Sequence, residues 1–124
     1  MNRIVVLALF STLSLYALEW NSYDAALKKQ KLSHKPIMID VVRTNCHYCK
    51  DMDKAVFEDK AMAQWIDERF IPVKINLDYE QLPLGLSVSF TPTFYFVDEN
   101  HQILKKVPGS WNIEDFKSLT ESIK

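Results

Sequence analysis

The two cysteines of this 124-residue chain, Cys46 and Cys49, are separated by His47 and Tyr48. A thiolate can attack a disulfide bond and form a mixed disulfide. A second thiol three residues further along a helix lies on the same face, where it can attack the mixed disulfide and release the substrate. The spacing predicts a two-step thiol–disulfide exchange site, with Cys46 as the exposed attacking thiolate and Cys49 as the more buried resolving thiol.

The cysteines follow a predicted strand and open a predicted helix. Residues 37–42 form an apolar run broken only by Asp40, and apolar residues recur at helical spacing after the pair: Met52, Ala55 and Val56. Unpaired N–H groups and the positive end of the helix dipole favour an anion at such a junction. We therefore expect the pKa of Cys46 to be lower than that of a free thiol.

Two other roles for the pair stay open. A Cys-x-x-Cys pair can be half of a zinc site, but such a site needs two more ligands, and the three histidines lack the paired spacing of structural zinc sites: His34, His47 and His101. The pair could also be an inert structural disulfide, although a bridge that closes so short a loop restrains the unfolded chain only weakly.

The N-terminus indicates export. A basic start, Met1-Asn2-Arg3, precedes an apolar stretch up to Leu15 that is too short to span a bilayer comfortably. This pattern predicts a signal peptide over residues 1–17, cleaved after Ala17, and a domain over residues 18–124. An uncleaved N-terminal anchor is the alternative, and both place the domain outside the cytoplasm.

Charge and size restrict the function further. Removal of residues 1–17 takes away one basic side chain, Arg3, and leaves 14 basic and 16 acidic side chains, a net charge near −2. This balance argues against a nucleic acid as a partner. A domain of this size can bury a sufficient core without a disulfide framework, so redox chemistry explains two cysteines in an exported domain better than architecture does.

The remaining pattern predicts an α/β fold. A first helix carries Trp20, Tyr23 and Leu27 on one face and is capped by Asn21 or Ser22. The other expected elements are a strand over 37–42, a helix over 46–56, a helix capped by Asp59, a strand over 70–76, a connection over 78–89 with one helical turn, a hairpin of strands 93–97 and 102–107, and a last helix capped by Asn112. This order favours one central mixed sheet with helices on both faces.

Four further positions resemble the thioredoxin superfamily, and the resemblance extends over nearly all of residues 18–124. Asp40 lies six residues before the first cysteine, and Lys74 lies on the next central strand. Pro92 lies between Thr91 and Thr93, directly before an aromatic strand, and Gly109 follows the hairpin. The resemblance implies a thioredoxin fold, a buried acid at Asp40 facing Lys74, and a cis-proline at Pro92 opposite the cysteines.

Within the superfamily, three flanking segments are most similar to exported reductases related to the C-terminal domain of DsbD: residues 20–36, 56–59 and 70–73. The resemblance implies a periplasmic protein-disulfide reductase that acts on disulfide-containing exported proteins. It also implies recharging by a membrane thiol electron carrier of the DsbD type, and no cofactor or metal beyond the redox-active Cys46–Cys49 disulfide.

The departures from the family leave two alternatives open. Asn45 stands where many members have a tryptophan, and the pair His47-Tyr48 is neither the Gly-Pro of cytosolic thioredoxins nor the Pro-His of strong oxidants. The dipeptide therefore does not fix the direction of electron flow. The alternatives are a thiol oxidase or isomerase on the same fold, and a non-catalytic exported module that binds a metal through Cys46, Cys49 and His47.

The resemblance assigns roles to the remaining site residues. Burial raises the pKa of a carboxyl, so we expect Asp40 to accept the proton of Cys49 through a water, with Lys74 tuning its charge. The two could instead form a buried pair that holds the strands in register. Pro92, if cis, turns the Thr91 backbone toward the sulfurs, where it can bind an extended substrate segment, whereas a trans proline would only open an edge strand.

The two residues between the cysteines complete the predicted substrate side of the site. A partial positive charge on His47 would lower the thiol pKa, unless this residue is merely solvated. Tyr48 is expected to dock partner proteins together with Phe90 and Trp111, and plain packing is the alternative for these aromatic side chains.

Overall fold

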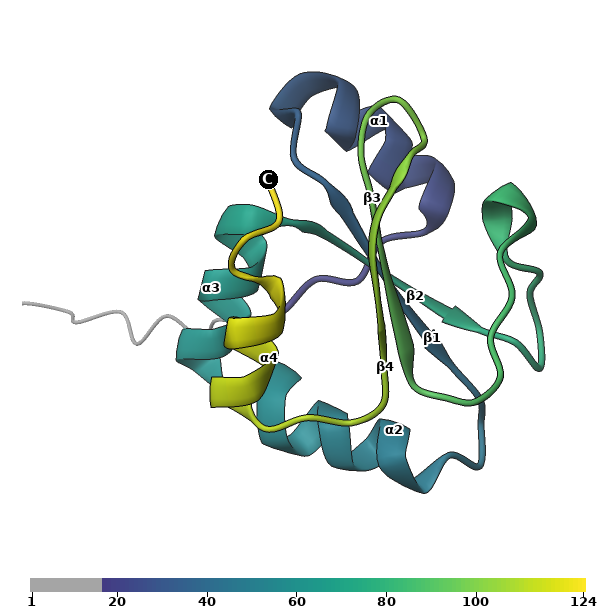
Figure 1. The fold of residues 1–124 in the computed structure, drawn as a ribbon, viewed down its shortest axis with the longest axis vertical. Coiled ribbons are helices and arrows are strands. Elements are labelled where there is room, and N and C mark those ends of the chain that lie inside the picture. The colour runs from purple at the N-terminus through teal and green to yellow at the C-terminus, as the bar shows by residue number, and fades with distance from the viewer. Residues whose placement is uncertain (1–16) are drawn as a thin grey trace, which may run out of the picture.

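The computed structural model of the protein describes residues 17–124, so the sequence features of the predicted signal peptide lie outside the described residues. The order of helices and strands along the chain can be followed in Figure 1. The elements are α1 (Tyr23–Ser33), β1 (Ile37–Val42), α2 (His47–Met52), the π-helix η1 (Asp53–Phe57), α3 (Lys60–Arg69), β2 (Ile71–Asn76), the 3₁₀ turn η2 (Pro83–Gly85), β3 (Thr93–Val97), β4 (Ile103–Pro108) and α4 (Ile113–Thr120).

The four strands form one mixed sheet in the order β2-β1-β3-β4. β1 pairs in parallel with β2 and antiparallel with β3, and β4 pairs antiparallel with β3. All six residues of β1 are buried, as expected for an apolar strand at the centre of a sheet covered on both faces. The predicted α/β architecture is therefore confirmed, and it places the end of β1 directly before the cysteines.

Helices cover both faces of the sheet. Figure 1 shows α3 and α4 side by side on one face, with α2 at the lower end of the sheet. The core between these helices and the sheet contains Met38, Met52, Val56, Phe57, Met62, Ile66, Phe70, Phe94, Phe96, Val107, Phe116 and Ile123. The opposite face is covered by α1 and by residues 77–88, with a core of Ala26, Ile37, Ile39, Val41, Ile71, Val73, Ile75, Tyr95 and Val97. Alternate residues of β1 thus point to different layers.

Aromatic side chains fix the cysteine helix to the sheet. Phe57 of η1 packs edge-to-face against Phe94 of β3 and Phe116 of α4, with ring centroids 5.8 and 6.0 Å apart. Phe94 and Phe116 are fully buried, and burial of such a side chain contributes about 1.5–3 kcal/mol. The segment that carries the cysteines is therefore anchored through its C-terminal end.

The start of the first helix differs from the prediction. Ser22 is the N-cap, and its Oγ accepts the Ala25 N–H at 3.2 Å, so Trp20 lies before the helix rather than on its face. Tyr23 and Leu27 pack on one side of the sheet, whereas Trp20 packs on the other, edge-to-face with Phe57 at 5.1 Å. The helical spacing of the three residues was misleading because the chain crosses the sheet edge before α1 begins.

The cysteine helix also differs from a single α-helix over residues 46–56. The α-helical turn ends at Met52, and the chain continues as the π-helix η1, in which the Glu58 N–H donates to the Asp53 carbonyl at 2.8 Å. Val56 and Phe57 are both buried there, whereas Ala55 is exposed. The wider π turn lets two consecutive side chains face the core.

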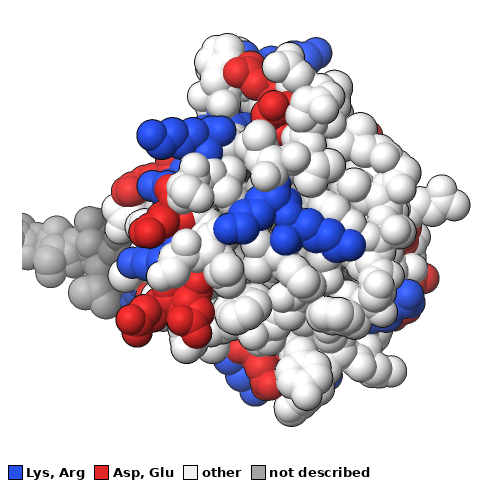
Figure 2. Space-filling model, viewed as in Figure 1, with Lys and Arg blue, Asp and Glu red and all other residues white. Residues whose placement is uncertain are grey.

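Figure 2 shows acidic and basic side chains together toward the left edge of the drawn face and a basic group near its middle, whereas much of the right half carries no charge. Within residues 17–124, no helix is both long enough and apolar enough to cross a membrane.

Candidate active site

The two cysteines form a disulfide at the start of α2, with their Cα atoms 5.2 Å apart. Cys46 is the N-cap of the helix, and its Sγ accepts the backbone N–H of Cys49 at 3.1 Å. A free N–H at the start of a helix stabilises negative charge on the sulfur that it faces, so this geometry favours a Cys46 thiolate after reduction.

The exposures of the two cysteines differ less than the sequence predicts. Cys46 is 8% exposed and Cys49 is 5% exposed, so both are buried in the disulfide form. Cys46 is covered because Thr91 and the first turn of α2 lie against its sulfur. Its predicted role as the attacking sulfur rests on its hydrogen-bond donors rather than on a large difference in exposure.

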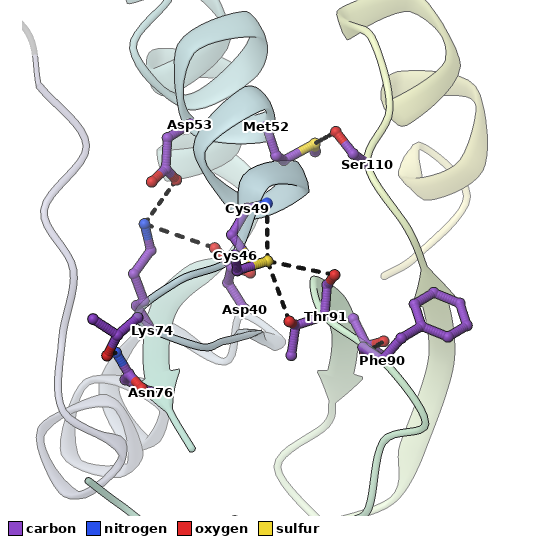
Figure 3. Close-up of a disulfide and its surroundings, with 12 residues drawn as sticks. Asp40, Cys46, Cys49, Met52, Asp53, Lys74, Asn76, Phe90, Thr91 and Ser110 are labelled. Carbon is purple, nitrogen blue, oxygen red and sulfur yellow. Dashed lines mark hydrogen bonds and ion pairs between the residues drawn. A yellow bond between two sulfur atoms is a disulfide. The ribbon is translucent and has the colours of Figure 1, made fainter. Parts of the chain in front are cut away.

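Thr91 and Pro92 directly precede β3, and Thr91 lies beside Cys46, as Figure 3 shows. The Thr91–Pro92 peptide bond is cis. The carbonyl oxygen of Thr91 lies 3.5 Å from Cys46 Sγ, and the Thr91 hydroxyl donates to the same sulfur at 3.2 Å. The Gly109 N–H donates to the Pro92 carbonyl at 2.8 Å and ties this turn to the end of β4.

Asp40 lies on the cysteine side of the sheet. In β1 it shares a face with Val42, which packs against Cys46 and Cys49. The residue is 1% exposed, and its Oδ1 has no hydrogen-bond partner. Burial raises the pKa of Asp40 to about 7, against the lowering effect of Lys74, while the negative charge of Asp53 raises it further. A buried carboxyl of this kind can accept a proton near neutral pH.

Lys74 lies opposite Asp40 in the parallel register of β1 and β2, but its ammonium group is shared. Its Nζ is 3.8 Å from Asp40 Oδ2 and 2.8 Å from Asp53 Oδ1. Only the shorter separation is a hydrogen bond. The sequence predicts the pair of Asp40 and Lys74 and misses Asp53, which lies four residues after Cys49, the spacing of neighbours on one helix face.

A set of polar contacts holds the loop between β1 and α2. Asp78 Oδ2 accepts the Thr44 N–H at 2.9 Å, and Asn76 Nδ2 donates to Thr44 Oγ1 at 3.2 Å. The hydrogen bond from the Thr44 N–H lowers the pKa of the Asp78 carboxyl, and the positive charge of Arg43 lowers it further by a smaller amount. No sequence pattern marks these residues, because their contacts join segments that are far apart in the chain at the ends of two neighbouring strands.

The two residues between the cysteines point outward. The His47 side chain is 81% exposed and contacts Asp51, with Nε2 and Oδ2 3.2 Å apart. Tyr48 is 64% exposed, and its ring lies edge-to-face against His47 at 5.6 Å. Neither residue contributes to the buried core, so both are available to an approaching molecule.

A groove of about 230 Å³ lies beside the disulfide and is lined by Tyr48, Phe90, Thr91, Pro92, Gly109 and Ser110. Phe90 is 56% exposed, so two aromatic side chains border this groove. Trp111 does not take the docking position predicted for it beside Tyr48 and Phe90. It packs against the core, and its Nε1–H donates to the Pro108 carbonyl at 3.0 Å. The geometry offers an extended peptide a path across the backbone of Thr91.

Among residues 17–124, no three side chains of the His, Cys, Asp and Glu types gather in the manner of a metal site.

The comparisons with known proteins agree with this geometry. A family model described as a thioredoxin-like domain matches residues 23–124. Anterior gradient protein 2-B of Xenopus laevis is 29% identical over 96 residues, which cover 77% of this chain. The chain spans less than two thirds of the curated relatives that it matches, 58% in this case.

Solved structures share the fold. A structure described as DsbH oxidoreductase superposes with a TM-score of 0.70 at 19% identity, covering 94% of this chain and 93% of that one. The reduced C-terminal domain of Neisseria meningitidis DsbD superposes with a TM-score of 0.62 at 20% identity, covering 82% of this chain and 93% of that one. At these identities the likeness concerns the arrangement of the backbone.

Proposed function

This chain belongs to the thioredoxin-like domain family, and from that premise we propose that it is a periplasmic protein-disulfide reductase. The family, the fold and the Cys-x-x-Cys pair make it a thiol–disulfide oxidoreductase. One observation supports the exchange chemistry in either direction: Cys46 Sγ faces two donors, the Cys49 N–H and the Thr91 hydroxyl, beside an open groove.

The first step is attack by the Cys46 thiolate on a disulfide of a partner protein. A bond forms between Cys46 Sγ and one substrate sulfur, while the other substrate sulfur leaves as a thiolate. The Cys49 N–H and the Thr91 hydroxyl stabilise the attacking anion before the reaction. The groove holds the substrate backbone beside Thr91, so that the reacting sulfurs are brought together.

The second step regenerates the disulfide seen in the structure. Cys49 loses its proton to Asp40, directly or through a water, and its sulfur attacks Cys46 Sγ. The bond between Cys46 and the substrate breaks, and the substrate leaves as a thiolate. The substrate has then gained two electrons and the protein has lost two, so a thiol donor must reduce Cys46–Cys49 before the next turnover.

The charges around the sulfurs support net reduction. In strong oxidants the thiolate is stabilised. This stabilisation favours the reduced state, so the disulfide takes up electrons readily. Here the Asp51 carboxylate offsets the positive charge that His47 could present, and a buried carboxyl at Asp40 lies under the cysteines. Each carboxyl group opposes accumulation of thiolate when it is ionised, which makes the dithiol a better electron donor.

The donor and the location follow from the same proposal. A basic and apolar N-terminus supports export, and the disulfide-containing clients are then exported proteins. We propose a membrane thiol electron carrier of the DsbD type as the source of electrons, since the periplasm is kept oxidising. Cell fractionation would test the location, and the carrier would be tested by the redox state of the protein in cells that lack it.

A redox titration of the purified protein against glutathione tests the direction. We expect a potential well below that of strong oxidants, closer to the roughly −270 mV of thioredoxin than to about −120 mV. A value near −120 mV would overturn the reductase proposal in favour of the oxidase alternative.

Two cysteine variants test the mechanism. Cys46→Ser should abolish insulin reduction, because no attacking sulfur remains beside the groove. Cys49→Ser should allow the first attack and accumulate a mixed disulfide through Cys46, because the resolving thiol is absent. Insulin reduction by Cys46→Ser at the wild-type rate would exclude the proposed mechanism.

A further inference from the structure

The Lys74 ammonium group is held away from Asp40 by two other groups. Its Nζ is 2.8 Å from Asp53 Oδ1 and lies 4.3 Å from the centroid of the Trp20 ring, a distance at which a cation is attracted to an aromatic face. The separation from Asp40 Oδ2 is 3.8 Å, which exceeds hydrogen-bonding distance. Figure 3 shows Lys74 between the two carboxylates.

The two carboxylates differ in their surroundings. Asp40 is almost fully buried and keeps Oδ1 without a partner, whereas the Asp53 side chain is 34% exposed. Asp53 and Lys74 line a cavity of about 310 Å³ that Glu58 also borders. Lys74 therefore donates its hydrogen bond to Asp53, the carboxylate that solvent can also stabilise. The buried carboxylate of Asp40 is left without a hydrogen bond from Lys74.

We propose that Asp53 is a positioning residue that holds the Lys74 ammonium away from Asp40, so that Asp40 is kept as the proton acceptor for Cys49. This inference rests on the proposed thiol–disulfide exchange and adds a residue that the reaction needs but does not touch. The charged groups facing Asp40 are Lys74 from β2 and Asp53 from η1. Val42, which lies on the same face of β1 as Asp40, packs against Cys46 and Cys49.

The chemical consequence concerns the resolving step. In that step the Cys49 sulfur forms a bond to Cys46 Sγ, the substrate thiolate leaves, and the Cys49 proton passes to the Asp40 carboxylate. A carboxylate that is fully paired with a lysine is a weak base. By drawing the ammonium group to itself, Asp53 keeps Asp40 basic enough to accept a proton near neutral pH.

The reaction of the reduced full-length protein with the aromatic disulfide DTNB separates the two steps. Attack by Cys46 releases one coloured thiolate, and resolution by Cys49 releases a second, so stopped-flow absorbance gives two phases. In Asp53→Asn we expect the pH midpoint of the second phase to fall by about one unit, because Lys74 then pairs with Asp40 alone. For a Brønsted coefficient of about 0.5, its rate at high pH should fall about threefold.

Glu58→Gln is the matched control, because it removes one negative charge from the border of the same cavity with an exposed side chain. It should leave the second phase unchanged. Asp53→Glu keeps a carboxylate at this position and should show the wild-type profile. Titration of the Asp40 carboxyl carbon by NMR should show the same downward shift of its pKa in Asp53→Asn. This readout does not depend on turnover.

A double-mutant cycle shows whether Asp53 acts through Lys74. Lys74→Met should raise the Asp40 pKa, and Asp53→Asn should have a much smaller effect in that background. An Asp40 pKa that stays the same in Asp53→Asn, or that moves equally in Glu58→Gln, would overturn this inference. Absence of the first coloured phase from wild-type protein would instead overturn the proposed exchange function, so the two failures are distinguishable.

Discussion

The Thr91 hydroxyl lies 3.2 Å from Cys46 Sγ, although 45 positions separate the two residues in sequence. Two features bring them together: the cis bond between Thr91 and Pro92, and the Gly109 N–H that holds the Pro92 carbonyl at 2.8 Å. The hydroxyl and the Cys49 N–H approach the same sulfur from different elements. Thr91 is therefore positioned to stabilise a Cys46 thiolate as well as a substrate backbone.

Thr91→Val should raise the Cys46 pKa by roughly one unit, because a hydrogen bond to a charged group contributes about 1.5 kcal/mol. The thiolate form of the reduced state is then less stable, and the potential should become more negative by about 30 mV. Thiolate absorbance against pH measures the first shift, and a glutathione titration measures the second. Thr91→Ser keeps the hydroxyl and should behave as wild type; an unchanged pKa in Thr91→Val would show that the hydroxyl does not stabilise the thiolate.

The sheet and its helices were predictable because their patterns are local. The apolar run around Asp40 marked the central strand, and Asp59 and Asn112 marked two helix starts that the structure confirms. Of the two candidate caps of the first helix, Asn21 and Ser22, the structure selects Ser22. Trp20 was assigned wrongly because periodicity cannot show where the chain crosses from one face of the sheet to the other. The π turn after Met52 was missed because it depends on tertiary packing of Phe57 rather than on residue type.

The site was predictable only in part. Spacing alone identified Cys46 and Cys49, whereas the expected pairing of Asp40 with Lys74 came from the resemblance to a family. Asp53 was missed, because its importance depends on a 2.8 Å contact with a lysine on another element. The Thr91 hydroxyl was missed for a similar reason: family reasoning pointed to the Thr91 backbone, and the side-chain contact exists only in the folded turn.

Phe90→Ala should weaken the binding of protein substrates. The side chain is 56% exposed at the border of the groove. Truncation of a residue that dominates an interface costs more than about 1 kcal/mol, so a docking role for Phe90 predicts a rise of about fivefold in KM for insulin. The reaction with a small disulfide should change much less. Tyr79→Ala removes an aromatic side chain that is 78% exposed outside the groove and serves as the control. Equal KM values in both variants would exclude a docking role for Phe90.

Gly109→Ala should destabilise the turn that supports Pro92. Gly109 has a φ of 98°, which side chains rarely adopt, and a Cβ there would lie 3.8 Å from Trp111 Nε1. We expect a loss of about 1–3 kcal/mol in the free energy of unfolding, measured with urea, together with slower insulin reduction. Gly85→Ala is the control, since Gly85 has a φ of 65° with nothing within 4 Å of an added Cβ. That variant should lose some stability and keep its activity, and an equal loss of activity would argue against a local effect at Pro92.

The Asp40 carboxyl should make the oxidised protein less stable as pH rises. Its pKa is raised to about 7 in the folded protein by burial, whereas an unfolded aspartate has a pKa of about 3.9. Between these values the folded state binds more protons than the unfolded chain, so the free energy of unfolding falls with increasing pH. At about 1.4 kcal/mol per unit, the loss approaches roughly 4 kcal/mol once the pH exceeds 7.

Asp40→Asn should abolish most of this pH dependence and be more stable than wild type above neutral pH, because an amide carries no charge to bury. Urea unfolding of both oxidised proteins between about pH 4 and pH 8 measures the difference. Asp59→Asn is the control, since it removes an exposed carboxyl and leaves a side chain that can still cap α3. Parallel pH profiles of wild type and Asp40→Asn would mean that the pKa of Asp40 is not raised in the folded protein, and its carboxylate would then be too weak a base to accept the proton of Cys49 near neutral pH.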